Sequence, residues 1–113
     1  MLMSQMKSVP QSSFKKLSDK VEVLRYQTTE PVSGYFYTFI VNNDFKHIYK
    51  EELTYTVMEG LTLIDNHKGR DGCDIEDNKY SLTVRPGTKK MVILEASPSG
   101  YSMAAKKKAS FSS

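Results

Sequence analysis

The feature that most constrains the fold is the recurrence of short segments rich in Tyr, Phe, Val, Ile and Thr, each bounded by turn residues. In residues 79–84, for example, Tyr80, Leu82 and Val84 alternate with polar neighbours. Alternation with a period of two is typical of a half-buried β-strand, because successive side chains point to opposite faces of a sheet. The repeated pattern predicts an all-β fold, an antiparallel β-sandwich of about six to eight strands.

Each expected strand can be placed from its composition and its flanking turns. Gly60 interrupts the longest one and indicates a bulge or a bend. Pro86 and Gly87 lie between two alternating segments, which predicts a β-hairpin there. The segment that contains Tyr35 to Phe39 is apolar on both faces, which favours a central strand buried on both sides. The expected strands cover residues 21–26, 34–41, 47–64, 79–84 and 89–96, and a last one starts at Tyr101.

Two segments lack a strand pattern. Residues 1–19 are rich in Ser, Lys and Gln and are expected to form a flexible, disordered N-terminal tail, with a short helix over 13–20 as the alternative. Residues 65–78 form the longest polar stretch and are expected to be an exposed loop. The predicted organisation is therefore a tail, residues 1–19, and a single β-sandwich domain, residues 20–113.

Composition narrows the class of protein. Hydrophobic residues make up 39% of the chain and aromatic residues 11%, which is enough for one core. The net charge of +3 is mild, so charge gives little reason to expect nucleic-acid binding. Neither a signal peptide nor a long apolar run is found, and Cys73 is the only cysteine, so we expect a cytoplasmic protein. Membrane contact, if any, would be peripheral.

The residues that could carry chemistry do not form a convincing site. A cysteine peptidase site needs a cysteine and a histidine, and Cys73 with His47 and His67 provides these residue types. The acids around Cys73, however, disfavour the thiolate form that a nucleophile needs. The sequence carries no phosphate-binding glycine loop and no hydrolase motif. We therefore expect no enzyme activity, no catalytic residues, no bound metal and no cofactor.

The same acidic segment raises the question of calcium. Its carboxylates are oxygen ligands, but their spacing does not match the twelve-residue calcium loop, and Lys68, Arg70 and Lys79 reduce the local charge. A solvated polar loop is the favoured interpretation, with a weak calcium site left open. The acids concerned are Asp65, Asp71, Asp74, Glu76 and Asp77.

The C-terminus carries the one concentrated basic cluster. Lys106, Lys107 and Lys108 precede Ser110 and Phe111, and Arg85, Lys89 and Lys90 are candidates to join them in space. Clustered lysines gain about 1 kcal/mol each near anionic lipid, so a weak membrane contact with Phe111 in the interface is one interpretation. Phosphorylation of Ser110 would then oppose binding. The alternative is that the lysines protect an exposed strand from aggregation.

Residues 34–108 resemble the accessory β domain of calpain-like cysteine peptidases and of small calpain-related proteins of protists. The residues that carry the resemblance are the Glu59-Gly60-Leu61 bend, the Val84-x-Pro86-Gly87 turn and the Pro98 to Ser102 turn. The resemblance implies a non-catalytic β-sandwich associated with the membrane or the cytoskeleton. Small members often carry N-terminal acylation, which Leu2 at the second position does not allow here.

These considerations lead to one expected function and two alternatives. The expected function is a protein-binding adaptor or regulatory module that uses an exposed strand edge or a loop face. Its partner would be a protein such as a calpain-like peptidase or a cytoskeletal protein. The alternatives are a peripheral membrane module that uses the C-terminal lysines, and an accessory fragment of a larger cysteine peptidase.

Overall fold

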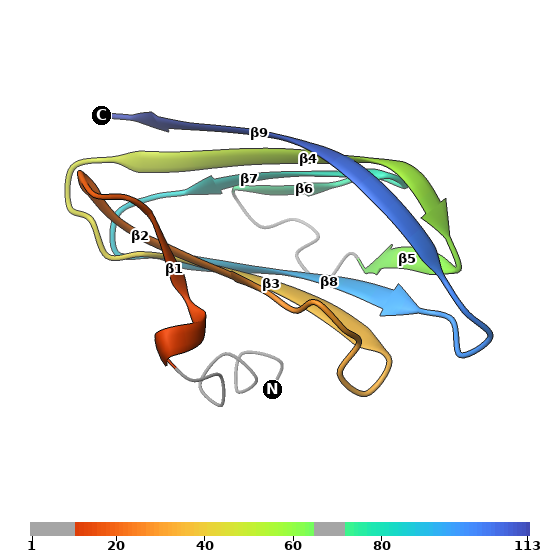
Figure 1. The fold of residues 1–113 in the computed structure, drawn as a ribbon. Coiled ribbons are helices and arrows are strands. Elements are labelled where there is room, and N and C mark those ends of the chain that lie inside the picture. Colours follow the sequence, from red (N-terminus) through yellow and green to blue (C-terminus); the bar gives the residue numbers. More distant parts are fainter. Residues whose placement is uncertain (1–10, 65–71) are drawn as a thin grey trace.

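The structure is a computed structural model that describes residues 11–64 and 72–113. These residues form nine β-strands and one short 3-10 turn, η1 (Gln11–Ser13), in two packed layers (Figure 1). The strands are β1 (Lys15–Ser18), β2 (Val21–Gln27), β3 (Tyr35–Asn42), β4 (Ile48–Glu59), β5 (Leu61–Ile64), β6 (Cys73–Ile75), β7 (Lys79–Val84), β8 (Lys89–Ala96) and β9 (Ser102–Ser112).

The two layers are antiparallel sheets. One has the strand order β1-β2-β3-β8-β5, and the other has the order β6-β7-β4-β9. This architecture confirms the predicted β-sandwich, with nine strands rather than about six to eight. The additional strands are short: β1 and β5 have 4 residues each and β6 has 3, which is too few for a period-two pattern to stand out.

The predicted hairpin at Pro86 and Gly87 is wrong. The strands on either side of this turn belong to different sheets, because β7 pairs with β4 and β6 whereas β8 pairs with β3 and β5. The turn is held by Asn42, whose buried side chain donates to the carbonyl of Val84 at 2.9 Å, and whose backbone carbonyl accepts from the amide of Gly87 at 2.9 Å. The turn residues therefore predicted correctly that the chain reverses, but not which strands pair.

Gly60 also transfers the chain between the sheets. It has φ +67° and separates β4, in the four-stranded sheet, from β5, in the five-stranded sheet. Its carbonyl accepts a hydrogen bond from the amide of Ser97 at 2.7 Å, which ties this bend to the β8–β9 connection. The expected bend is therefore confirmed, and a separate irregularity in the β4–β9 register lies between Tyr55 and Val57.

Strand β1 lies inside the segment that the sequence analysis assigned to the tail. It pairs with β2, with Lys15 opposite Arg25, and it follows η1 directly, so no helix forms over the described part of 13–20. Its sequence, KKLS, is mostly polar, which fits a strand whose first two residues are exposed and whose last two are partly buried. Of these four residues, Leu17 packs against the main core. Residues 1–10 lie outside the described residues.

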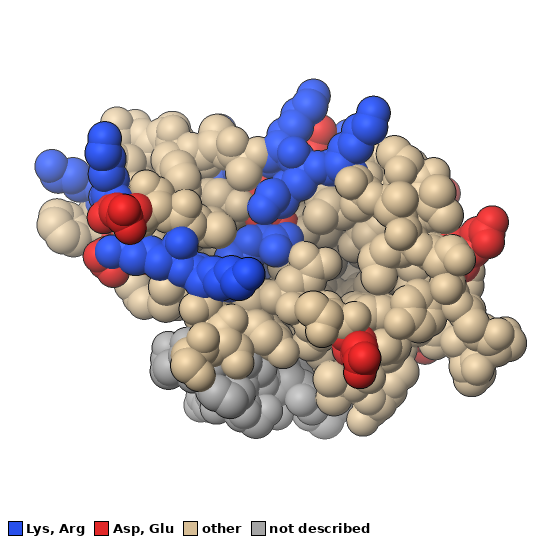
Figure 2. Space-filling view, viewed as in Figure 1, with Lys and Arg blue, Asp and Glu red and all other residues tan. Residues whose placement is uncertain are grey.

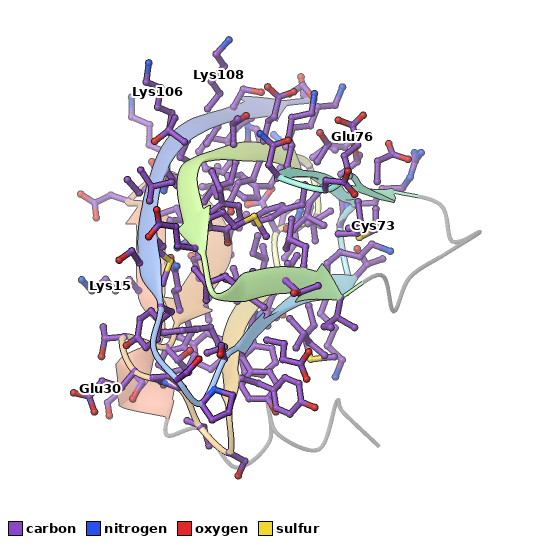
Figure 3. All side chains as sticks on the ribbon, turned by 90° about the vertical axis from the view of Figure 1, so that its right-hand side faces the viewer. Lys15, Glu30, Cys73, Glu76, Lys106 and Lys108 are labelled. Carbon is purple, nitrogen blue, oxygen red and sulfur yellow. The ribbon has the colours of Figure 1, made fainter. Side chains whose placement is uncertain are left out.

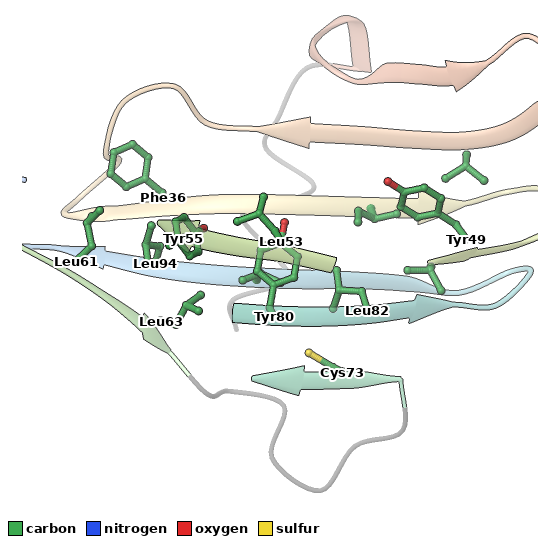
Figure 4. Close-up of a cluster of buried hydrophobic side chains, with 14 of the residues drawn as sticks. Phe36, Tyr49, Leu53, Tyr55, Leu61, Leu63, Cys73, Tyr80, Leu82 and Leu94 are labelled. Atoms are coloured by element: carbon green, nitrogen blue, oxygen red, sulfur yellow. The ribbon is translucent and has the colours of Figure 1, made fainter. Parts of the chain in front are cut away.

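The main core fills the space between the sheets. Figure 4 shows its side chains, among them Tyr49, Leu53, Tyr80 and Leu82, all of which are buried. A second cluster lies on the opposite face of the five-stranded sheet, where Tyr37, Phe39, Met91 and Ile93 are buried. Strand β3 contributes to both clusters, which confirms the prediction of a central strand that is apolar on both sides.

Candidate functional site

Strand β9 is the longest edge of the sandwich. It has 11 residues and pairs along its whole length with β4, from Ile48↔Ser112 to Glu59↔Ser102. Among the described residues, no strand pairs with its other side. The other three edge strands have 3 or 4 residues each. Because short edges are a usual protection against unwanted strand pairing, β9 is the one edge left long enough to template another strand.

The three predicted lysines lie at the middle of this edge. Residues that oppose each other in an antiparallel pair point to the same face of the sheet. Lys106 lies opposite Thr54 and Lys108 opposite Glu52, on the outer face, and Figure 3 shows both side chains extending away from the sandwich. Lys107 lies opposite the buried Leu53, so it points toward the other sheet.

Ser110 and Phe111 follow on the same strand. Ser110 is exposed on the outer face opposite Lys50, so the residue predicted as a phosphosite lies beside a further lysine. Phe111 points inward and packs against Tyr49, with 5.2 Å between the ring centroids, and it keeps 37% of its surface exposed. Arg85 follows β7, and Lys89 and Lys90 lie on β8 of the other sheet, so the structure does not bring them to the lysines of β9.

A cleft of about 870 Å³ opens between the inner side of β9 and the β1–β2 edge of the other sheet. Three cationic side chains from three different strands line it, namely Lys15, Arg25 and Lys107. In Figure 2 the Lys and Arg side chains gather in the upper left and centre of the molecule, over β9 and this neighbouring edge. Apolar side chains, Leu17, Phe36 and Met103, complete part of the wall.

Arg25, which lines this cleft, belongs to a buried ion pair with Glu51. Arg25 on β2 donates from Nε to Glu51 Oε1 at 2.7 Å and from its terminal nitrogen to Oε2 at 2.9 Å, so the pair links the two sheets. Tyr49 donates to the same carboxylate at 2.7 Å and Tyr80 at 2.5 Å. The side chain of Glu51 has no exposed surface and that of Arg25 keeps 12%. The four hydrogen bonds satisfy a charge that burial would otherwise penalise.

The pKa values of this network follow from its geometry. Burial alone raises the pKa of Glu51, but the hydrogen bonds and the charge of Arg25 outweigh it, and the net pKa lies below the ordinary value. Burial and the neighbouring carboxylate raise the pKa of Tyr80, and burial raises the pKa of Tyr55 to about 12. At neutral pH the cluster therefore holds one carboxylate, one guanidinium and neutral phenols.

The residues considered for catalysis and for calcium are separated. Cys73 is buried in the main core on β6 rather than exposed in a loop (Figures 3 and 4). His47 lies in the β3–β4 connection, where its Nδ1 is 2.8 Å from Asp44 Oδ2. His67, Asp65 and Asp71 lie outside the described residues. Asp74, Glu76 and Asp77 are exposed, and no group of three or more metal-ligating side chains occurs in the part of the chain that the structure describes.

The Arg25–Glu51 pair was not predicted from the sequence. The available signal was position: Arg25 follows Val21 and Val23 at intervals of two, and Glu51 lies between Tyr49 and Leu53 in the same way. A charged residue in the inward register of two expected strands indicates a buried pair. The pairing partner could not be identified, since Arg25 and Glu51 are 26 positions apart in the chain and their strands lie in different sheets.

Comparison with protein-family models, with curated proteins and with solved structures finds no match. A search of residues 11–64 and 72–113 for a helix of the length and apolarity needed to cross a membrane also finds none.

Proposed function

We propose that this protein is a non-catalytic binding module that pairs its β9 edge with an extended segment of another protein. The observation that carries the proposal is the length and exposure of this edge, 11 residues that are paired on one side only among the described strands. In β-augmentation the main-chain groups of the edge supply affinity, and the side chains on either face supply selectivity.

The rest of the fold is consistent with a rigid platform for such an edge. Strand β4, to which β9 is attached, is fixed by the buried Arg25–Glu51 pair and by Tyr49, Leu53 and Tyr55 in the core. A rigid edge loses little conformational entropy when it binds. The other edges of the two sheets are the short strands β1, β5 and β6, which offer no comparable length of backbone.

The membrane alternative receives less support from the arrangement of the side chains. A flat lipid surface would need the lysines on one face, but Lys107 points opposite to Lys106 and Lys108. Phe111, the residue expected to enter the interface, packs against Tyr49. A calpain-like peptidase and a cytoskeletal protein remain proposed partners, on the resemblance of the sequence alone. The same resemblance carries the proposal that the chain is an accessory fragment of a larger cysteine peptidase.

Strand addition is tested with a neutral peptide of about eleven residues, blocked at both ends, in which threonine and valine alternate. The peptide is titrated to millimolar concentration into isotopically labelled protein. We expect the largest amide chemical-shift changes on residues 102–112 and slower amide exchange along this strand. A second peptide with N-methylated backbone at alternate positions cannot form the ladder and is the control. Equal effects of both peptides, or shifts confined to other elements, would refute the proposal.

A further inference from the structure

We infer that the segment that pairs with β9 is acidic, with a run of carboxylates at its centre opposite Lys106, Lys107 and Lys108. This inference rests on the proposed function and specifies the chemistry of the partner. It is carried by the position of the lysines within the strand, by the faces to which they point and by the cationic cleft beside them.

The three lysines lie at the centre of β9. The strand runs from Ser102 to Ser112, so Lys107 is its midpoint with five residues on either side. Any partner strand that uses the full length of the edge must place its central residues opposite these three lysines. Unlike a basic cluster at the end of a strand, this one cannot be avoided by a shift in register without losing a large part of the ladder.

Charge repulsion disfavours a second copy of this chain as the full-length partner. Antiparallel pairing of two identical strands has a twofold axis, and full overlap of residues 102–112 places that axis at Lys107. Lys107 would then oppose its own copy, and Lys106 would oppose Lys108 of the other copy in both directions. Like charges that oppose each other directly destabilise a sheet. The lysines therefore select against self-pairing and for carboxylates.

The inner face of β9 also carries positive charge, because Lys107 lines the cleft together with Lys15 and Arg25. Successive residues of an added strand point alternately outward and inward. The residue opposite Lys107 would point inward, on the side of the cleft lined by Lys15, Arg25 and Lys107. Of these three cations, Arg25 is paired with the carboxylate of Glu51, which also accepts from Tyr49 and Tyr80. A carboxylate of the partner would complement the positive charge that Lys15 and Lys107 leave in the cleft.

The residues outward of the cleft complete the pattern. Carboxylates opposite Lys106 and Lys108 would lie on the outer face, where β4 adds the positive charge of Lys50 and the negative charge of Glu52, so β9 with its two outer lysines leaves this face net positive. The complement of the edge is therefore a run of three consecutive acidic residues within an extended segment. Each opposed pair contributes roughly a 1.4- to 5-fold gain in affinity, so three pairs contribute roughly 3- to 150-fold.

The test compares peptides that differ in their three central residues. The neutral peptide described above is compared with versions that carry three glutamates or three lysines at the centre. We expect the glutamate peptide to bind at least about threefold more tightly than the neutral peptide, the lysine peptide to bind most weakly, and the difference to shrink as salt is raised. N-methylation should abolish binding of the glutamate peptide.

Protein variants assign the effect to the edge. The variant Lys106→Gln, Lys107→Gln, Lys108→Gln should lose the preference for glutamate and keep binding to the neutral peptide. The matched control Lys20→Gln, Lys46→Gln, Lys89→Gln removes the same charge from exposed positions off β9 and should keep the preference. The variant Lys107→Gln alone isolates the contribution of the cleft.

The outcomes separate the two proposals. Equal binding of the glutamate and neutral peptides would overturn the acidic partner and leave strand addition standing. Binding of the glutamate peptide that survives N-methylation would overturn strand addition as its mode. Salt-sensitive binding to anionic vesicles that is lost in the β9 variant, with no peptide binding, would overturn both and assign the lysines to lipid.

Discussion

At the scale of single residues, the carboxylate of Glu51 has no exposed surface and accepts hydrogen bonds from Arg25, Tyr49 and Tyr80. Removing one partner of such a pair leaves an uncompensated buried charge. We expect Arg25→Met to lower the free energy of unfolding by about 3–5 kcal/mol. Urea denaturation measures this change.

The double variant Arg25→Met, Glu51→Leu is the control, since it replaces both charges by apolar groups. It should lose less stability than Arg25→Met alone, because no charge is stranded. If the losses in Arg25→Met alone and in Glu51→Leu alone add up to the loss in the double variant, the interpretation of a coupled pair would be contradicted.

Two carboxylates make stability depend on pH in the acid range. Hydrogen bonds from the backbone of Glu22 and from His47 hold the pKa of Asp44 well below its ordinary value, and the pKa of Glu51 is also lowered. A carboxyl whose folded pKa is depressed contributes stability above its unfolded pKa, and this contribution is lost as the pH falls. We therefore expect the free energy of unfolding to decline below about pH 4.5.

The acid decline can be assigned with two matched variants. Asp44→Asn removes one of the depressed carboxyls and should make the decline shallower, whereas Glu30→Gln removes an exposed acid and should leave its slope unchanged. Urea denaturation at about six pH values between 3 and 7 suffices for the comparison. The same slope in Asp44→Asn and in the wild type would contradict the assignment.

At the scale of elements, the bend at Gly60 decides how the longest strand segment is divided between the sheets. Its φ of +67° disfavours any residue with a side chain, and a Cβ there would overlap the carbonyl oxygen of Gly100 in the β8–β9 turn. We expect Gly60→Ala to lower the free energy of unfolding by roughly 2–4 kcal/mol.

Gly34 provides the matched control for this bend. Its φ is +85°, but nothing lies within 4 Å of a Cβ built there, so Gly34→Ala loses only the backbone part, about 1 kcal/mol. Chemical denaturation of both variants tests the difference. Equal losses would show that the close approach to Gly100 contributes nothing.

At the scale of the whole molecule, the sandwich has one long edge, and its central lysines are expected to keep copies apart. The variant Lys106→Thr, Lys107→Thr, Lys108→Thr removes the repulsion and adds β propensity. We expect its dissociation constant for self-association to fall roughly 3- to 150-fold below that of the wild type, as sedimentation velocity would measure.

The control for self-association is the variant with Lys20, Lys46 and Lys89 changed to Thr, which lowers the net charge equally without touching β9. It should sediment like the wild type. If both triple variants associate to the same extent, net charge and not the edge would be the cause.

The sequence by itself determined the all-β class, most of the strands and the central place of β3, because period-two alternation and turn residues are local properties of the chain. It also located the basic cluster that the structure places on β9. The tertiary structure alone decided that β7 and β8 lie in different sheets, that Arg25 meets Glu51, and that Lys107 points inward while Lys106 and Lys108 point outward on an open edge. These features depend on pairing between segments far apart in the chain. A local pattern fixes which face a side chain takes, but not which strand lies beside it.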